Sequence, residues 1–335
     1  MPVLLALLIG AGAVAHASEP PKPAMPGFEI VRKHIDVAVQ ANAGYIEISN
    51  VAYKVLTEQG RDALRQFEFS YTANYQIMAI GKAYSQKPDG TQIPVARGAI
   101  LYGQGSTSRP GFSDVRTITV VFSNVEVGDQ VVIETYFKQN IPWFPNQFAT
   151  SFNFTRLTVA HDVRVTLTAP DGFPLQIDVA GLEGGKREVA GGQIYWEWTF
   201  HNDVAQREEE GAVDEADEGP HLAIGSFPDF KAVAATYRAV MDGKANVTPE
   251  IQALADTLTK DVSGRRAQAR VLYDWVSQHI AYVSLVLGAG GFTPHEAGEV
   301  LAHKYGDCKD HVMLLDALLK AKGIDSSPVL IDTNN

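Results

Sequence analysis

Cysteine is nearly absent from this chain, because Cys308 is the only one among 335 residues. A single thiol cannot form an internal disulfide, so the stability of the protein has to come from packing. In an oxidising compartment a free thiol is a liability unless it is buried or used. Cys308 therefore needs an explanation in the fold or in the function.

Basic residues are also in short supply. The chain has 28 Lys and Arg against 39 Asp and Glu, a formal net charge of -11, and no basic stripe. Because binding to nucleic acid needs clustered cations, this composition argues against a nucleic-acid partner. An acidic run at 207–218 lacks the ligand spacing of a calcium loop, which favours a solvated loop over a cation site. The glycine-rich 288–291 is not followed by the Lys-Ser/Thr of a phosphate loop.

Long apolar runs are missing beyond the N-terminus. Residues 3–14 are apolar but too few to span a bilayer comfortably, and Ala15-His16-Ala17 fits a cleavage site. We interpret 1–17 as a signal peptide that lacks the usual basic start; an uncleaved anchor is the alternative, although no stop-transfer pattern follows. Residues 18–26 form a proline-rich lead-in. We expect an exported protein without a membrane span after cleavage.

Period-two alternation dominates the region from 27 to 225. Val163 to Thr168 and Tyr195 to Phe200 alternate cleanly, and 131–137 is rich in β-branched and aromatic residues. Turn sequences such as Pro-Asp-Gly at 88–90 and 170–172 separate the runs. This pattern predicts an antiparallel β-sandwich of about ten strands over 27–225.

The pattern becomes helical near Phe227. Helices are predicted at 229–242, 249–260, 264–280, 294–303 and 308–322, and a turn that leads into a strand at 324–331. Thr248 before Pro249 is a helix start, and Thr293 with Glu296 predicts a capping box. Gly323 after the basic last turn predicts the end of the last helix.

Cys308 falls at the start of that last helix. Asp307 is expected to be the N-cap and Asp310 to be N3, which places Cys308 at the first helical position. The helix N-terminus favours the thiolate, and its free N–H groups can hold a developing oxyanion. Asp307 and Asp310 oppose the thiolate and Lys309 offsets them in part, so a general base is needed. The alternative is that Cys308 is a small, inert, buried apolar side chain.

Several motifs carry a family resemblance. Residues 290–295 (Gly-Gly-Phe-Thr-Pro-His), 305–310 (Tyr-Gly-Asp-Cys-Lys-Asp) and the leucine-rich 314–324, with Trp275 to Val283 upstream, resemble the bacterial transglutaminase-like family. In the N-terminal region, 83–90 and 122–129 resemble the strand-turn signatures of the domain of unknown function 3857. That domain precedes the transglutaminase-like one in an exported branch of the family.

The resemblance implies a multi-domain protein with an all-β sandwich at 27–225 and an α+β papain/transglutaminase-like domain at 226–335. It implies a Cys-His-Asp triad with Cys308 as nucleophile, and with the His and Asp on strands beyond the cysteine helix. Because the chain stops at Asn335, we expect only the helical nucleophile half of that domain here. The implied activity is thiol-dependent acyl transfer or hydrolysis of protein or peptide amides, in the periplasm of a Gram-negative bacterium.

The histidines near Cys308 suggest two alternatives. His311 lies three residues after Cys308 on the same helix and could act as its base, although the two would share one turn. His295, His303, Cys308 and His311 could bind a metal ion, but two of them come from a different predicted helix. Solvated or core histidines remain the better interpretation, so no metal or cofactor is expected.

The second functional hypothesis is a non-catalytic module. In it the β region binds a partner, such as an extended peptide of a cell-envelope protein added to a sheet edge, and the papain-like part is vestigial. Trp143 and Phe144, with Trp196 and Trp198, could form an aromatic binding surface, but packing in a core or between domains is the expected role. In both hypotheses the partner is a protein or peptide.

Overall fold

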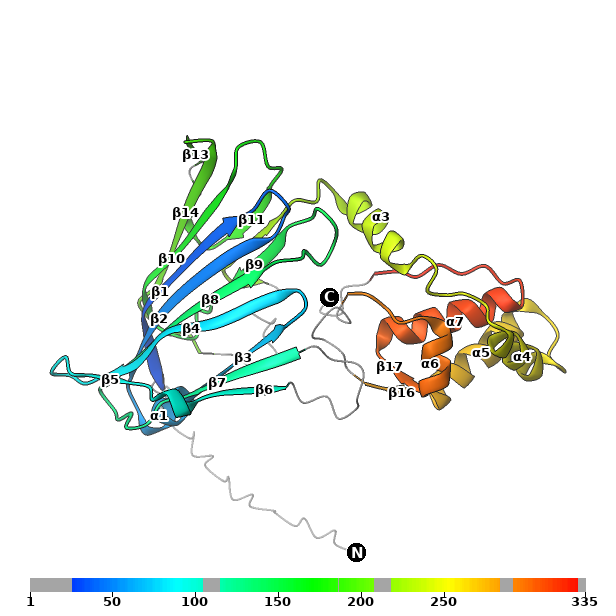
Figure 1. Ribbon diagram of the computed structural model, residues 1–335, viewed down its shortest axis with the longest axis horizontal. Helices are drawn as coiled ribbons and strands as arrows, with labels where there is room; N and C mark the ends of the chain where they lie inside the picture. The colour runs from blue at the N-terminus through cyan, green and yellow to red at the C-terminus, as the bar shows by residue number, and fades with distance from the viewer. Residues whose placement is uncertain (1–25, 105–114, 186, 208–217, 284–291, 331–335) are drawn as a thin grey trace, which may run out of the picture.

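The computed structural model describes residues 26–104, 115–185, 187–207, 218–283 and 292–330. It shows a β-rich N-terminal region followed by a smaller region of helices (Figure 1). The sequence prediction of this order is confirmed. The expected signal peptide, nearly all of the proline-rich lead-in, most of the acidic run and the glycine-rich 288–291 lie outside the described residues.

A nine-stranded sheet forms the body of the N-terminal region. Its order is β12-β14-β10-β1-β2-β8-β4-β5, with β13 also paired to β14. The bounds are β1 Phe28–Val39, β2 Tyr45–Val55, β4 Gln76–Gln86, β5 Gln92–Pro94, β8 Gln130–Gln139, β10 Ala160–Pro170, β12 Glu183–Gly184, β13 Glu188–Ala190 and β14 Gln193–Asn202. Clean alternation, as in β14, puts alternate side chains into the core and leaves the others outside.

Two three-stranded sheets cover the large sheet. One has the order β3-β7-β6 and the other β11-β15-β9. The bounds are β3 Gln66–Thr72, β6 Ile100–Gln104, β7 Val115–Val121, β9 Ala149–Asn153, β11 Gln176–Ala180 and β15 His221–Gly225; the helix α1 Glu58–Leu64 and the 3-10 turn Arg97–Ala99 also belong to this region. More strands form than the sequence suggested, because several are too short to show a period.

Each small sheet closes its own hydrophobic core. Ile35 of β1 packs with β10, β14 and β15 in one core, and Val51 of β2 packs with β7 and β8 in the other. Lys33 is the cross-strand partner of Val51, and Lys33 and Ile35 are two residues apart on β1. Ile35 and Val51 therefore point to the same face, so both small sheets cover that face of the large one. The β-sandwich expected from the sequence is confirmed.

One strand pair departs from the predicted antiparallel pattern. β1 pairs with β10 in parallel, with Ile35 opposite Val165, whereas the other pairs of the large sheet are antiparallel. Eight strands of the two kinds of sheet lie between β1 and β10 in the chain, so β10 reaches β1 by a long crossover instead of a hairpin. Alternation in the sequence defines a strand but not the direction of its neighbour.

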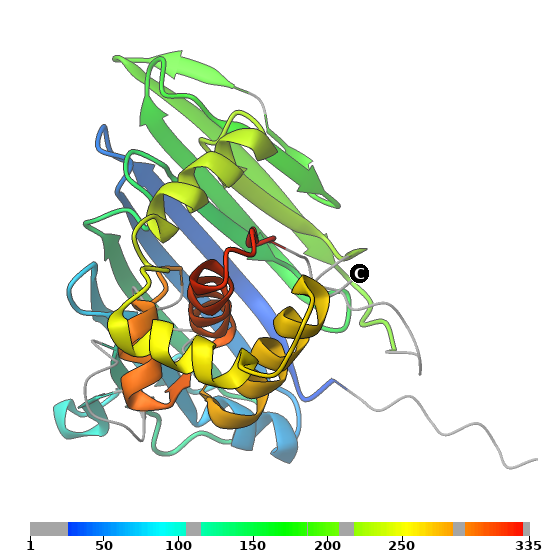
Figure 2. The ribbon, with the colours of Figure 1, turned by 90° about the vertical axis from the view of Figure 1, so that its right-hand side faces the viewer.

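The C-terminal region packs its helices around α7. The elements are α3 Phe230–Met241, α4 Pro249–Thr259, α5 Arg265–His279, β16 Ala281–Tyr282, α6 Ala297–His303, β17 Tyr305–Gly306 and α7 Cys308–Ala321. Leu314 and Leu318 of α7 are fully buried in one core with residues of α4, α5 and α6. β16 and β17 pair in parallel just before α7 begins. Figure 2 shows α7 nearly end-on, among the other helices and in front of the large sheet.

Two local predictions in this region are wrong. The Thr293 capping box does not form: α6 begins at Ala297 with Glu296 as an N-cap that makes no side-chain bond. The backbone N–H of His295 instead donates to Asp310, which draws this segment toward α7. Gly323 does end the last helix, with φ 64°. The expected strand after it is absent from the described residues 324–330, which have no strand partner there to satisfy their backbone groups.

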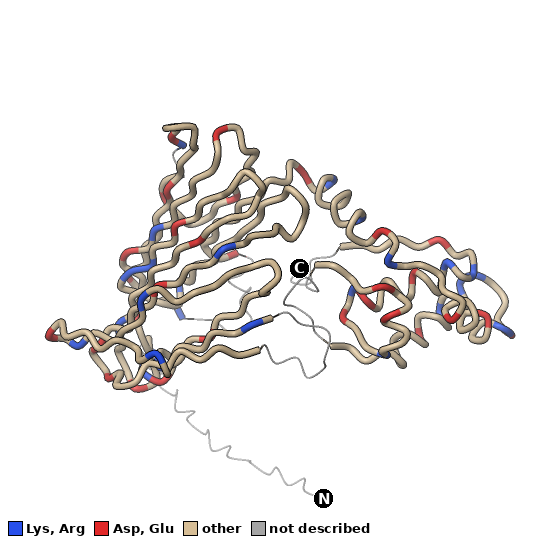
Figure 3. The backbone as a smooth tube through the Cα atoms, viewed as in Figure 1, with Lys and Arg blue, Asp and Glu red and all other residues tan. Residues whose placement is uncertain are grey.

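Charged residues of both signs are spread along the chain. Figure 3 shows Lys and Arg interspersed with Asp and Glu along both regions. Within the described part of the chain, no helix is long and apolar enough to cross a membrane.

Candidate active site

Cys308 lies at the first position of α7, and its side chain is exposed. Asp307 is the N-cap, and its carboxylate accepts hydrogen bonds from the N–H groups of Lys309 at 3.2 Å and Asp310 at 3.4 Å. Asp310 completes the capping box by accepting from the Asp307 N–H at 3.1 Å. The predicted cap is thus present. The alternative of a buried cysteine is wrong, because the side chain is exposed.

Asp310 links the first turn of α7, which carries Cys308, to the segment that contains His295. It is fully buried, and one carboxylate oxygen accepts the backbone N–H of His295 at 2.8 Å. The His295 Nδ1 lies 3.1 Å from each of its oxygens. Burial alone would raise the pKa of Asp310, but the hydrogen bonds from His295 and Asp307 outweigh it, and the pKa falls below its ordinary value. Asp310 therefore stays ionised and holds the turn that carries Cys308.

Gly306 makes room for this carboxylate. A Cβ at Gly306 would lie 2.5 Å from the Cβ of Asp310, which is closer than two non-bonded carbon atoms can approach. The glycine in the Tyr-Gly-Asp-Cys motif is thus required by packing against Asp310.

Lys309 neutralises the N-cap. Lys309 and Asp307 are both buried, 8% and 3% exposed, and the Nζ of Lys309 forms an ion pair with Asp307 Oδ2. The negative charge beside Cys308 is therefore partly compensated by its nearest neighbours, as the sequence suggested. Breaking one partner of such a buried pair would leave an uncompensated charge.

Two tyrosines interact electrostatically with the first turn of α7. Burial first, and then negative charge at Cys308 and Asp307, raises the pKa of Tyr237 of α3. The same causes raise the pKa of Tyr282 of β16. Both phenols therefore stay protonated at neutral pH and can donate a hydrogen bond. Tyr282 belongs to the family-like stretch before α6, whereas nothing in the sequence marks Tyr237.

The histidines near Cys308 have other partners. His311 places Nδ1 2.7 Å from the Asp307 carbonyl and Nε2 3.2 Å from the Ile280 carbonyl. Because both ring nitrogens face carbonyls, neither is directed at the thiol, and the His311 base interpretation has no support. His295 faces Asp310, and the His303 ring lies 5.7 Å from the ring of Tyr305. Among the described residues, no group of three or more His, Cys, Asp or Glu is placed to hold a metal ion.

Aromatic residues of the β region approach the segment before α6. Trp143 and Phe144, from the connection between β8 and β9, each lie 5.5 Å from the ring of Phe292. Phe144 also lies 6.0 Å from Phe227. These residues pack between the two regions, as expected from the sequence, and Trp198 is buried in the sandwich core.

Comparison with known families gives two matches. The domain of unknown function DUF3857 matches residues 41–206, and the transglutaminase-like superfamily matches residues 252–332. The second match contains Cys308 and the whole of α7. The C-terminal part of the chain is a transglutaminase-like core. The chain thus carries a DUF3857 domain followed by a transglutaminase-like core, as the motifs predicted.

One solved structure shares the fold. The crystal structure of a candidate protease from Parabacteroides distasonis matches with a TM-score of 0.78 and 18% identity, covering 89% of this chain. The chain spans 59% of the length of that protein. An M1 zinc metallopeptidase from Deinococcus radiodurans has 9% identity and a TM-score of only 0.31, over 60% of this chain and 42% of its own, too low to define a shared fold. Comparison with curated proteins finds no match.

Proposed function

We propose that Cys308 is the nucleophile of a thiol-dependent acyl transferase or peptidase that acts on protein or peptide amides. The observation that carries this proposal is the exposed thiol at the first position of a capped helix, in a turn fixed by a buried carboxylate. The match to the transglutaminase-like superfamily supports it. We also propose that the boundary between the β domain and the transglutaminase-like domain lies between residues 225 and 226.

The reaction would proceed through a thioester. The Sγ of Cys308 attacks the amide carbonyl carbon, the carbon–nitrogen bond breaks, and the amine leaves with a proton. The developing oxyanion would be held by free N–H groups of the first turn of α7 and by a phenol of Tyr237 or Tyr282. Water or an amine then attacks the thioester and regenerates the thiol.

The general base is proposed to be a histidine, oriented by an aspartate, from the part of the domain that follows α7. His295 and His311 are turned to Asp310 and to backbone carbonyls, so they are structural in this proposal. We also propose export to the periplasm, with a cell-envelope protein or peptide as substrate.

A trapped thioester is the test. The full-length protein is incubated with a peptide amide library and analysed by intact mass. We expect a hydroxylamine-sensitive acyl adduct on Cys308 that is absent from Cys308→Ser. Amide turnover that persists in Cys308→Ser would overturn the proposal.

One observation favours the second candidate, a binding module. β6 lies at the edge of its sheet and pairs only with β7 among the described strands, and its Leu101 and Tyr102 are 52% and 72% exposed. An extended peptide could add to this edge. If that is the function, Cys308→Ser binds the peptide as the unmodified protein does, whereas a proline in place of Leu101 abolishes binding.

A further inference from the structure

A cavity of about 190 Å³ lies where the β region meets the segment before α6. Its wall comes from both regions: Tyr45 of β2, the connection between β8 and β9, Phe227 after β15, and Phe292. None of the described residues that form this wall is acidic or basic. An apolar cavity of about 150 Å³ is large enough to bind a benzene ring. This cavity therefore has the size and the charge that suit a single neutral ring.

Aromatic side chains make up much of the wall. The ring of Phe144 lies 6.0 Å from that of Phe227 and 5.5 Å from that of Phe292, at interplanar angles of 76° and 69°. Tyr45 and Phe148 meet in the same way, at 5.4 Å and 78°. Aromatic rings favour such edge-to-face contacts. A further ring in the cavity would find the same kind of partners.

Two polar side chains of the wall are already hydrogen-bonded. Burial raises the pKa of Tyr45 to about 12, and its side chain is hydrogen-bonded to Thr150, so the phenol stays neutral. Gln139 is 2% exposed and uses both ends of its amide. Its Nε2 donates to the Ile141 carbonyl at 2.6 Å, and its Oε1 accepts from Gln76 at 2.7 Å. Neither side chain is left to bind a ligand.

Gln147 is different, because its amide is held at one end only. Ser226 is 5% exposed; its Oγ accepts the backbone N–H of Phe148 at 2.9 Å and donates to Gln147 Oε1 at 2.7 Å. The ladder of β9 and β15, in which Ala149 pairs with Gly225, continues into this contact and fixes it. Within the described ranges, Gln147 Nε2 donates no hydrogen bond. The wall therefore holds a donor in place without an acceptor.

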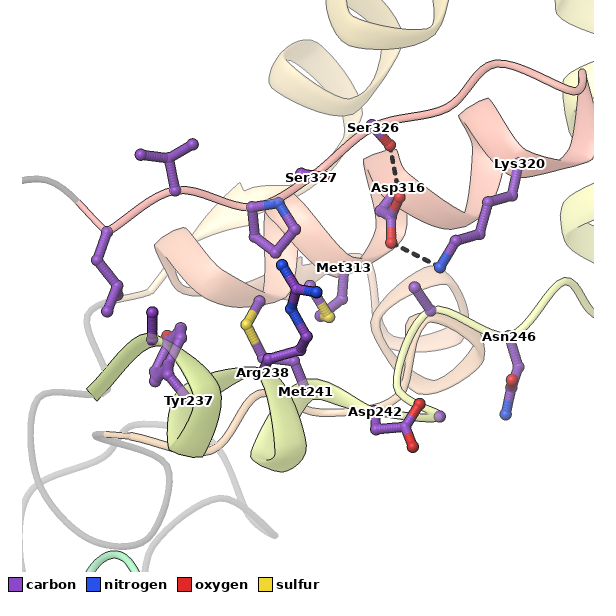
Figure 4. Close-up of a pocket in the computed structure, with 16 residues that line it drawn as sticks. Tyr237, Arg238, Met241, Asp242, Asn246, Met313, Asp316, Lys320, Ser326 and Ser327 are labelled. Atoms are coloured by element: carbon purple, nitrogen blue, oxygen red, sulfur yellow. Dashed lines mark hydrogen bonds and ion pairs between the residues drawn. The ribbon is translucent and has the colours of Figure 1, made fainter. Parts of the chain in front are cut away.

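A larger cavity, of about 590 Å³, lacks this combination. It lies between α3, α7 and the segment 326–330 (Figure 4). Its Asp316 is 8% exposed and already accepts hydrogen bonds from Ser326 Oγ and Lys320 Nζ. Its Arg238 is exposed, so water solvates the guanidinium. In the smaller cavity, by contrast, a fixed donor meets an aromatic wall.

We propose that the smaller cavity binds a phenol ring, with Gln147 Nε2 donating a hydrogen bond to the phenolic oxygen. This oxygen is an acceptor as well as a donor, and the ring supplies the apolar surface that the wall fits. The ring belongs either to a tyrosine of a peptide or to a free phenolic compound, which share this chemistry. Cys308 does not line the cavity, so the inference stands apart from the proposed function.

Dissociation constants for two matched pairs of probes test this proposal on the whole chain, by ligand-observed saturation-transfer NMR. One pair is p-cresol and toluene, and the other is acetyl-Gly-Tyr-Gly amide and acetyl-Gly-Phe-Gly amide. Within each pair the probes differ only in the phenolic oxygen. We expect the phenol of at least one pair to bind about fivefold more tightly than its partner, as one hydrogen bond implies. If the tyrosine peptide binds more tightly than p-cresol, the ligand is a peptide; the reverse order identifies a free phenol.

Three variants locate the ring. Gln147→Met removes the donor and keeps the length of the side chain, so the two members of a pair should then bind equally. Gln193→Met makes the same change at an exposed position of β14 outside the wall and should keep the fivefold preference. Ala149→Leu puts a larger side chain into the wall and should weaken the binding of phenols and of plain rings alike.

Equal affinities within both pairs, or no binding of any probe, would overturn this inference. A preference that survives Gln147→Met, or that is also lost in Gln193→Met, would overturn it as well, because the donor would then not be Gln147. Unchanged binding in Ala149→Leu would place the ring outside this cavity and count equally against the proposal.

Discussion

Asp310 connects the first turn of α7, which carries Cys308, to the segment before α6. It closes the capping box, accepts the backbone N–H of His295 and faces the His295 ring. Its lowered pKa reflects these bonds, which outweigh the cost of burial. We therefore regard Asp310 as a positioning residue that holds the turn of Cys308 without reaching the substrate.

Replacing Asp310 with Asn should lower the free energy of unfolding by about 1–3 kcal/mol at neutral pH, because buried donors lose a charged acceptor. A carboxyl whose folded pKa is depressed stabilises the fold above its ordinary value of 3.8, and this contribution is lost as the pH falls through the folded pKa. The difference in the free energy of unfolding between wild type and variant should therefore have its full size at about pH 7 and about pH 5. It should become smaller toward about pH 3. Urea unfolding followed by circular dichroism measures it.

Asp274→Asn is the matched control for that experiment. Asp274 lies on the surface of α5, where its pair with Arg270 spans 3.7 Å and both side chains are largely exposed. Such a pair contributes less than about 1 kcal/mol. A difference for Asp310→Asn that does not change with pH would contradict the role given to the Asp310 charge.

At the scale of elements, α7 stabilises the C-terminal core and also presents the thiol. Leu314 is fully buried against the neighbouring helices, whereas Val312 on the same helix is 38% exposed. Two parts of this helix therefore have different roles. The buried side chains pack α7 against the neighbouring helices, and the capped first turn positions Cys308.

Leu314→Ala should therefore destabilise the C-terminal region by about 2–5 kcal/mol, through lost burial and a residual cavity. Val312→Ala should cost less than about 1 kcal/mol. Thermal unfolding of both variants gives the comparison. Equal losses would mean that the buried side of α7 is assigned to the wrong residues.

The elements near Cys308 were largely predictable from local sequence. Asp307, Asp310 and Gly323 act within one turn of the helix they cap, so their spacing alone identifies them. The start of α6 was not predictable, because Asp310, fifteen residues away, binds the backbone of His295 and prevents the Thr293 cap. Tyr237 packs against the core around α7 because α3 joins that core, and no local sequence pattern predicts this packing.

At the scale of the molecule, an aromatic contact joins the two regions. Phe292 precedes the segment that reaches Asp310, and it packs against Trp143 and Phe144 of the β region. The β region thereby supports the segment next to the nucleophile. The sequence could suggest that these aromatics pack between domains, but their partner Phe292 lies far along the chain.

A double-mutant cycle on Trp143→Ala and Phe292→Ala should show a coupling of about 0.5–1.5 kcal/mol, as expected for a direct aromatic pair. The free energy of unfolding of the two single variants and the double variant gives this value. Phe230→Ala is a control for aromatic truncation, since Phe230 is 92% exposed. Strict additivity of Trp143→Ala and Phe292→Ala would contradict a contact between the regions.

The central claim is that the first turn of α7 makes Cys308 a reactive nucleophile. It is tested most directly by the second-order rate constant for alkylation of Cys308 with iodoacetamide at about pH 7, compared with a free cysteine derivative. The exposed Sγ lies at the N-terminal end of α7, where free N–H groups can stabilise negative charge that develops during reaction, so a rate at least about fivefold above the free thiol is predicted. A rate equal to or below that of the free thiol would contradict the claim.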